Sequence, residues 1–366
     1  MFKQLSIIKT KLFAEITSIP EILQPSHLPG LDGLRGISII LVVLSHLLWS
    51  IDRDLPIGSF GVNVFFVISG FLITTILLKE KVKTGSISLK NFYLRRILRI
   101  MPVAYLYIGV LILLNIIFNL HLSPQHFITA VLYIKNIPFK GVGDWYTGHF
   151  WSLSVEEQFY LIFPILLVFH QNKYVLIVTI TVLLIECAEY LGYNSIWINQ
   201  SNFIVHYLLF GIINLFGNGT IEILFGSLIS VLLFKDIINF KGFKFNYWLS
   251  FGLFILTFLI DVFFSSYSIF SIFFSVILSF IILNNLYQSN FLGSVLNNVI
   301  LVRIGMLSYS IYIWQQLFTA YQPWAKSFKY SNSIIFNLIA LTIVVFSSYY
   351  LYELQFLKLK KKIKNN

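Results

Sequence analysis

An arginine and a histidine, Arg35 and His46, stand eleven residues apart in an otherwise apolar segment. At about 100° per residue, eleven residues return to nearly the same helix face, so both side chains line one stripe, roughly 16 Å apart. Ionisable groups are costly inside a bilayer and usually mark a functional path. Singly, His46 could be a satisfied core histidine and Arg35 could snorkel to the interface. As a pair on one face they favour catalysis by an imidazole acting near neutral pH.

Three more arginines, Arg95, Arg96 and Arg99, cluster before an apolar run. Arg95 and Arg99 are four residues apart and share a helix face. Guanidinium groups bind phosphate bidentately, so the cluster predicts a docking site for a phosphorylated donor that arrives from the cytosol. Topology anchoring and contact with lipid head groups are the alternative.

Carboxylates also lie inside apolar runs. The adjacent side chains of Glu156 and Glu157 point about 100° apart, so they do not form a matched acid–base pair. We expect one to face the interior and hold a cationic or hydrogen-bonding group, which can be the His46 imidazole. The other is expected to reach the interface, and a structural role for both is the alternative. Glu222 is a further carboxylate that we expect near the outer face.

Two polar segments can line a cavity or form helix–helix seams. In residues 58–74, Asn63 stands among small residues, and we expect it to line the same cavity as His46. A glycine packing seam is the alternative there. Residues 304–316 carry hydroxyl, amide and indole groups, for which a seam tied by hydrogen bonds is equally plausible.

The composition is that of a polytopic membrane protein. Of 366 residues, 57% are hydrophobic and only 11% are charged, whereas a soluble domain has about 25% charged residues. Apolar runs of about 20 residues recur along the chain, as membrane-spanning helices require. Cys187 is the only cysteine, so the chain offers no internal disulfide and no cysteine-based metal cluster. We therefore predict an all-α bundle without a metal site.

The net charge of +11 does not indicate nucleic-acid binding. The basic residues gather beside apolar runs, at Lys79–Arg99 and at Lys358–Lys364, where the positive-inside rule places them in the cytosol. They are not interleaved with a soluble binding domain.

Charge also decides the expected number of spans, which is about ten, with both termini in the cytosol. This arrangement leaves only Arg53, Lys135, Lys140, Lys326 and Lys329 outside. An eleventh span at 203–216 would place the basic tail outside the cell, against the positive-inside rule. We therefore predict that this stretch is an external re-entrant or interfacial segment. The expected spans are 35–51, 59–78, 101–120, 151–169, 174–190, 219–234, 247–264, 267–286, 304–322 and 334–353.

The remaining segments follow from this topology. Residues 1–28 lack a clean apolar core with a cleavage site, so we expect a cytosolic or interfacial segment rather than a signal peptide. A membrane domain spans 29–355, and a basic cytosolic tail spans 356–366. The external loop 121–150 has no evident structure, and loops of this length are often functional.

The order of these motifs resembles acyltransferase family 3, the integral-membrane acyltransferases that include the bacterial O-antigen acetylases. The similarity runs from about Leu28 to Leu357. The arginine–ten residues–histidine motif is Arg35 with His46, within the GLDGLRG context of residues 30–36. The other matching motifs, in family order, are GVNVFFVISGFLI at 61–73, RRILR at 95–99, Trp151-Ser-Leu with Glu156-Glu157, SYSIYIW at 308–314 and YYLYE at 349–353.

Two positions depart from the family pattern. Gln315 stands where many members have a histidine, so base chemistry is not expected from it. Gly219 stands where members often have an arginine, which leaves the partner of Glu222 open. No SGNH-type hydrolase domain is evident, so a second, relay step would need another protein.

The resemblance implies transfer of an acyl group, most often acetyl, from cytosolic acyl-CoA to a hydroxyl of an envelope glycan in the bacterial plasma (inner) membrane. No permanently bound cofactor is expected; acyl-CoA is a co-substrate, and the partners are lipid and the glycan. Direct base catalysis by His46 and an acyl-histidine intermediate both stay open. A lipid-linked glycan transporter or polymerase is the main alternative, and a membrane sensor or scaffold is a third.

The predicted site has three groups of residues. The catalytic group is His46, Arg35, Glu156 and Glu157, and the donor-binding group is Arg35, Arg95, Arg96 and Arg99. The substrate-binding group is Asn63, Trp151, Ser152, Glu222, Tyr309, Tyr312 and Trp314.

Overall fold

The computed structural model describes residues 2–25, 27–49, 56–139, 141, 143–193, 203–217, 219–264 and 269–363, and these residues contain helices and no strands. The predicted all-α class is therefore confirmed. The ends of the expected spans at 50–51 and 267–268 and the tail residues 364–366 lie outside the described part, as do Arg53 and Lys140.

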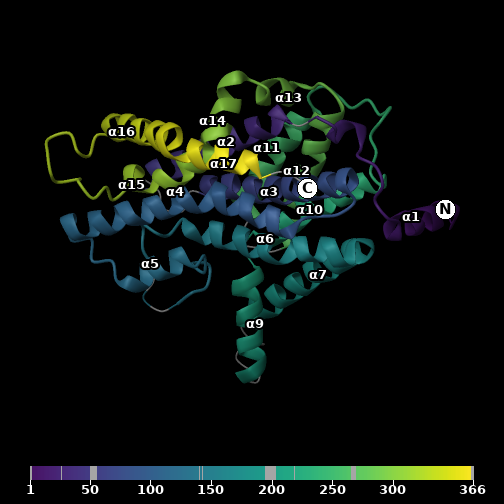
Figure 1. The fold of residues 1–366 in the computed structure, drawn as a ribbon, viewed down its shortest axis with the longest axis horizontal. Helices are drawn as coiled ribbons and strands as arrows, with labels where there is room; N and C mark the ends of the chain where they lie inside the picture. The colour runs from purple at the N-terminus through teal and green to yellow at the C-terminus, as the bar shows by residue number, and fades with distance from the viewer. Residues whose placement is uncertain are drawn as a thin grey trace.

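The long helices lie side by side, roughly along the horizontal of Figure 1. The α-helices are α1 (Phe2–Phe13), α2 (Pro29–Leu47), α3 (Ile57–Thr84), α4 (Leu89–Phe118), α5 (Pro124–Val131), α6 (Phe150–His170), α7 (Tyr174–Tyr193), α9 (Phe203–Phe216), α10 (Thr220–Phe234), α11 (Leu249–Phe264), α12 (Ile269–Tyr287), α13 (Phe291–Leu296), α14 (Val299–Trp314), α15 (Gln316–Thr319), α16 (Ile334–Ser347) and α17 (Leu354–Lys362). Three short turns, η1 (Glu21–Leu23), η2 (Gln171–Lys173) and the π-helical η3 (Ser348–Glu353), complete the described helical elements.

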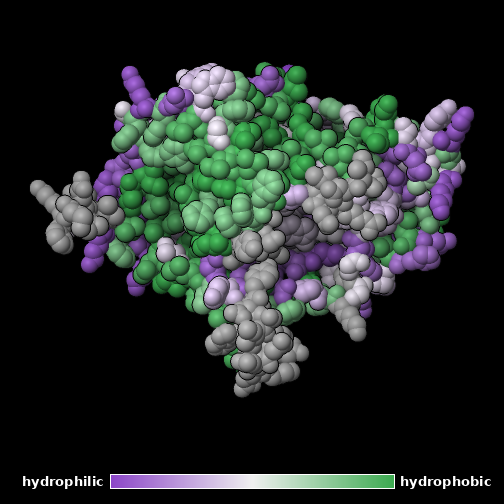
Figure 2. Space-filling model, turned by 180° about the vertical axis from the view of Figure 1, so that it is seen from behind, coloured by the Kyte–Doolittle hydropathy of each residue, from purple (hydrophilic) through white to green (hydrophobic). Residues whose placement is uncertain are grey.

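Six described helical stretches are long and apolar enough to cross a membrane, or seven if Leu208–Phe216 and Thr220–Phe234 form one span bent by 59°. The helices α11 and α14 are apolar but shorter, and α6 with α7 falls within one continuous stretch. Segment 203–216 is a helix that meets α10 at this bend. Figure 2 shows a broad hydrophobic surface with hydrophilic residues gathered toward the two sides of the view.

The helix that contains the expected third span, residues 101–120, begins before that span. Helix α4 starts at Leu89 rather than at residue 101, because Ser88 caps its N-terminus by accepting a hydrogen bond from the backbone N–H of Asn91. The arginine cluster therefore lies within the helix, two to three turns from its start.

Glycines let the central helices approach closely. A Cβ at Gly36 would lie 2.3 Å from the Leu301 carbonyl oxygen of α14, and one at Gly70 would lie 1.9 Å from the Ile223 carbonyl oxygen of α10. These contacts join α2 to α14 and α3 to α10. The glycine seam weighed for the second span against the first is also present, because a Cβ at Gly61 of α3 would lie 2.5 Å from the Ser38 carbonyl oxygen of α2.

The N-terminal segment packs against the bundle. Leu23 of η1 is fully buried, and Ile16 is 4% exposed. The Lys235 ammonium donates to the Ala14 carbonyl at 2.6 Å, and the Lys79 ammonium donates to the Pro25 carbonyl at 2.9 Å. Residues 14–25 are thereby held beside the ends of α3 and α10.

Candidate active site

Two polar contacts join α2 to α14. The Arg35 guanidinium donates to the Ser308 hydroxyl at 3.0 Å, and the Nδ1 of His46 lies 2.7 Å from the Gln315 Oε1. Both α2 side chains therefore face the same neighbouring helix, and the predicted shared face is confirmed. The order of these contacts also makes α2 and α14 parallel.

The protonation of His46 can be followed through its neighbours. The Gln316 Nε2 donates to the Trp145 carbonyl at 2.7 Å, and this acceptor is fixed by the backbone. The Gln316 Oε1 then accepts from the Gln315 Nε2 at 2.9 Å, which turns the Gln315 Oε1 toward the imidazole. Because an amide oxygen only accepts, the Nδ1 of His46 carries a proton, and in the neutral imidazole the Nε2 then has a lone pair. The imidazole is thus set up to take a proton at Nε2.

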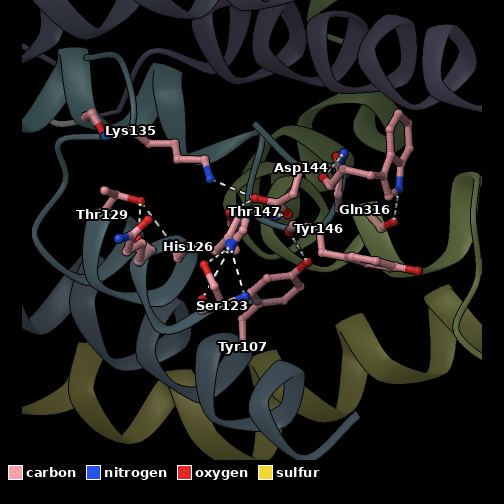
Figure 3. A network of polar contacts seen from close by, with 12 residues as sticks. Tyr107, Ser123, His126, Thr129, Lys135, Asp144, Tyr146, Thr147 and Gln316 are labelled. Atoms are coloured by element: carbon pink, nitrogen blue, oxygen red, sulfur yellow. Dashed lines mark hydrogen bonds and ion pairs between the residues drawn. The ribbon is translucent and has the colours of Figure 1, made fainter. Parts of the chain in front are cut away.

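The segment that holds Trp145 belongs to the external loop predicted at 121–150. This loop is not without structure, because it contains α5 and an ordered network (Figure 3). The Lys135 ammonium lies 2.7 Å from the Asp144 carboxylate, with the two side chains 6% and 8% exposed. Asp144 also accepts from the backbone N–H of Thr147 at 2.7 Å. A buried ion pair that is also hydrogen-bonded to the backbone fixes the local chain, here the chain next to Trp145.

A cluster of aromatic rings centred on Trp145 lies beside the imidazole. The Trp145 ring lies edge-on to His46 at 5.2 Å and contacts Trp49 at 5.3 Å and Tyr321 at 5.4 Å. Tyr321 has a left-handed backbone with φ 49°, which is strained for a bulky residue. Its carbonyl accepts from the Tyr146 hydroxyl at 2.8 Å, which helps to hold this conformation.

A cavity of about 510 Å³ opens among α2, α3, α4, α6, α14 and α17. Eight of the predicted site residues line it: Arg35, Arg95, Arg96, Arg99, Ser152, Glu156, Tyr309 and Tyr312. At one end the lining includes Pro25 and Lys79, near the N-terminal segment. At the other end the Tyr312 hydroxyl lies 2.6 Å from the Ser152 hydroxyl and donates to the His149 carbonyl at 3.0 Å.

The four predicted donor-binding arginines differ in how they are paired. Arg95 meets the buried Glu80 at 2.8 Å, and Arg35 meets Asp32 at 3.3 Å. Arg96 lies between both predicted glutamates and stacks 3.5 Å over the Tyr160 ring. Arg99 has no hydrogen-bond or ion-pair partner within the described part of the chain. Arg99 is therefore the member of the cluster whose donors are open to an incoming anion.

The glutamates do not take the positions that we expected. Arg96 lies 3.5 Å from Glu156 and 3.1 Å from Glu157, so both carboxylates face inward and neither reaches the interface. The suggestion that one of them orients the imidazole is wrong for this structure, because Gln315 occupies that position. Both carboxylates can pair with Arg96 although they point about 100° apart on the helix, because the planar guanidinium has several N–H donors.

Asn63 is also placed differently. Its amide donates to Asp261 of α11 at 2.8 Å, and Ser59 donates to the same carboxylate at 3.1 Å. Asn63 is not among the residues that line the cavity. His46 does not line this cavity either, so the expected cavity shared by Asn63 and His46 stays a prediction. The Asn63 amide binds the buried Asp261, which the sequence analysis did not consider.

Five further predicted residues lie outside the cavity lining, although their roles are otherwise untested: His46, Trp151, Glu157, Glu222 and Trp314. Trp151 packs on Phe66 with ring centroids 5.9 Å apart, and Trp314 packs on Tyr107 at 5.6 Å. Glu157 and Glu222 do not line the cavity either.

Glu222 is 2% exposed in the first turn of α10, and its Oε2 has no partner within the described residues. The departure at Gly219 has a steric reason. Gly219 has φ 88°, and a Cβ there would lie 1.9 Å from the Phe66 ring, so the family's arginine cannot fit this backbone.

Sequence reasoning missed two side chains at the ends of the site. Gln315 is the partner of His46. His149 is 4% exposed, and its ring packs 5.2 Å from that of Tyr107 and 5.7 Å from that of Tyr312. The family departure at Gln315 was the signal for the first; a histidine just before α6 was a weak signal for the second.

This combination of an arginine-lined cavity and an aligned histidine agrees with a comparison against known families, in which a model described as an acyltransferase domain matches residues 28–353. The chain belongs to acyltransferase family 3. The match covers the membrane helices and every predicted site residue.

Relatives of known name match a shorter region. A Staphylococcus aureus (strain COL) protein provisionally named an O-acetyltransferase is 39% identical over 154 residues, which are 39% of this chain and 25% of the relative. The O-acetyltransferase OatA of Staphylococcus aureus (strain NCTC 8325 / PS 47) is 37% identical over 161 residues, 41% of this chain and 26% of OatA. The match thus spans about a quarter of these relatives. No solved structure matches the chain at the same level of significance.

Proposed function

We propose that this acyltransferase moves an acyl group, foremost acetyl, from cytosolic acyl-CoA to a hydroxyl of an envelope glycan. The observation that carries the proposal is the pair of contacts between α2 and α14. These contacts connect Arg35, which lines the cationic cavity, with His46, which lies three turns further along the same helix. The names of the staphylococcal relatives support acetyl as the acyl group and an O-linked acceptor.

The donor would enter from the cytosolic end of the cavity. Arg99 has donors open to a phosphate, and Arg35, Arg95 and Arg96 keep the cavity positive although they are paired. The pantetheine arm would then extend toward Tyr312 and Ser152, with its thioester leading. Charge-assisted contacts to phosphate are strong in such a site.

The chemistry would use the lone pair on Nε2 of His46. As a base, Nε2 takes the proton of the acceptor hydroxyl while that oxygen attacks the thioester carbonyl carbon. The carbon–sulfur bond then breaks, and the departing CoA thiolate takes the proton from the imidazolium. In the alternative route, Nε2 attacks the thioester carbonyl carbon, and the carbon–sulfur bond breaks to release the CoA thiolate. The acceptor hydroxyl then attacks the acyl carbon, which breaks the bond to Nε2, and the hydroxyl proton passes to the thiolate. In both routes Gln315 acts by holding the proton at Nδ1.

The proposed topology has ten spans, with both termini in the cytosol of a bacterium and the domain in its inner membrane. The ten would be α2, α3, α4, α6, α7, α10 with α9, α11, α12, α14 and α16. The parallel contacts of α2 and α14 support this count, because the first and ninth spans must run in the same direction. Residues 1–28 and 356–366 would lie on the cytosolic side of the domain at 29–355.

Binding of acetyl-CoA to the purified chain in nanodiscs tests the donor part of the proposal. We expect saturable binding that weakens about tenfold or more in Arg99→Ala, which removes a charged contact to phosphate. Arg303→Ala is the matched control, because Arg303 is an exposed α14 arginine outside the cavity lining. Absence of binding, or equal binding by Arg99→Ala, would contradict the proposal and favour a glycan transporter or polymerase.

A further inference from the structure

The C-terminal helix α17 begins at a π-helical turn. In η3, the carboxylate of Glu353 is 7% exposed and accepts hydrogen bonds from the hydroxyls of Ser310 and Ser348, the latter at 3.2 Å. A π-helical turn inserts an extra residue and thereby rotates the face of the helix that follows. Because Ser310 belongs to α14, these bonds fix the direction of α17 relative to the helix that carries Gln315.

One lysine of α17 differs from its neighbours. The helix packs along α4, beside it in Figure 1. Lys360 is half-buried and lines the cavity, whereas Lys358, Lys361 and Lys362 are exposed. Lys360 lies within electrostatic range of Arg95, Arg96 and Arg99. The basic tail therefore contributes one specific cation to the cavity in addition to its general positive charge.

The charges in the cavity do not balance. Six cationic side chains line it: Arg35, Lys79, Arg95, Arg96, Arg99 and Lys360. Three of the arginines meet carboxylates, and Lys79 donates to a carbonyl. Within the described chain, Arg99 and Lys360 have neither a hydrogen-bond nor an ion-pair partner. Unpaired cations held close to like charges in a partly dry cavity are unfavourable unless an anion joins them.

We propose that Lys360 binds the 3′-phosphate of the CoA donor, so that α17 forms part of the donor site. The inference rests on the proposed function, since it assigns a group of the same donor. CoA carries a pyrophosphate in its middle and a phosphate monoester on its ribose, at the end opposite the thioester. With the thioester directed toward Tyr312, the phosphate monoester lies at the cytosolic end of the cavity. Lys360 of α17 lines the cavity at this end. A lysine suits a compact phosphate monoester as a point charge, while Arg99 is left for the pyrophosphate.

The test compares two probes that differ only in this phosphate. Dissociation constants of CoA and 3′-dephospho-CoA are measured with the full chain in nanodiscs with and without phosphatidylglycerol. We expect wild-type protein to bind CoA about tenfold or more tightly than 3′-dephospho-CoA. Lys360→Ala should bind both probes with the weaker constant, and Lys360→Arg should regain part of the difference. Lys361→Ala is the matched control and should keep the wild-type ratio.

Each other outcome has one meaning. If Lys360→Ala keeps the wild-type ratio, the assignment is wrong. The same conclusion follows if Lys361→Ala loses the ratio equally, because the effect is then general surface charge. If Lys360→Ala changes only the dependence on phosphatidylglycerol, the lysine binds a lipid head group and not the donor. If wild-type protein binds neither probe, the proposed function fails, and this inference fails with it.

Discussion

Replacing Gln315 by leucine should slow acyl transfer while leaving the binding of acyl-CoA unchanged. Gln315 is fully buried, and it holds the His46 Nδ1 at 2.7 Å while its own amide is held at 2.9 Å by Gln316. Leucine removes the acceptor, so Nδ1–H either stays buried without a partner or the proton moves to Nε2, where the lone pair is needed. An unsatisfied buried donor costs about 1–3 kcal/mol. If this penalty falls on the active tautomer, kcat should drop by about 5- to 150-fold.

The assay is single-turnover acetyl transfer by purified protein, together with the dissociation constant of acetyl-CoA. Gln315→Glu is the control, because a carboxylate also accepts from Nδ1–H. It loses the bond that the Gln315 Nε2 donates to Gln316 and should still keep more activity than the leucine variant. Gln316→Leu removes the next link without touching His46 and should have a smaller effect. The reasoning is refuted if Gln315→Leu transfers at the wild-type rate, or if Gln315→Glu is as slow as the leucine variant.

Three further predictions concern the parts that hold the site. Trp145→Phe keeps an aromatic ring beside His46 but loses the hydrogen bond from Nε1 to the Gln316 carbonyl at 2.8 Å. A loss of ~1 kcal/mol should lower kcat by about fivefold. An unchanged kcat would argue against a role for this bond. Lys135→Met leaves Asp144 buried without its cation and should destabilise the protein by about 3–5 kcal/mol, measured by denaturant unfolding in detergent. Lys135→Met with Asp144→Asn should recover much of this loss, and no recovery would contradict the pairing. Gly70→Ala places a Cβ 1.9 Å from the Ile223 carbonyl and should lower stability by about 1–3 kcal/mol, whereas Gly109→Ala, with nothing within 4 Å, should not.

Much of the fold followed from the sequence because the rules of a bilayer are strict. Apolar runs must be helices, since backbone groups cannot stay unpaired in lipid. The stripe of Arg35 and His46 followed from helix period alone. Helix α4 is longer than the span expected at 101–120, because the hydropathy rises only after the arginines whereas the helix begins at the Ser88 cap. The number of spans stays a prediction, because α11 and α14 are shorter than a typical span.

The partners within the site could not be predicted from periodicity. Gln315 and His46 are 269 residues apart, so their contact depends on how α2 and α14 pack. Asn63 had a predicted place in the cavity, but Asp261 of α11 takes its amide instead. Which side chains of α17 face the cavity depends on the π-helical turn at Ser348–Glu353, because this turn rotates the helix that follows it. The rotation leaves no regular pattern in the sequence. Lys360 was therefore indistinguishable from the other lysines of the tail.

Acyl transfer by the histidine is the central claim, and one measurement tests it most directly. Membranes containing the wild-type chain or His46→Ala, at equal levels of inserted protein, are supplied with radiolabelled acetyl-CoA, and label in envelope glycan is counted. The account predicts label with wild-type protein and only background with His46→Ala, while both proteins bind acetyl-CoA. Equal labelling of glycan by the two proteins would contradict the account.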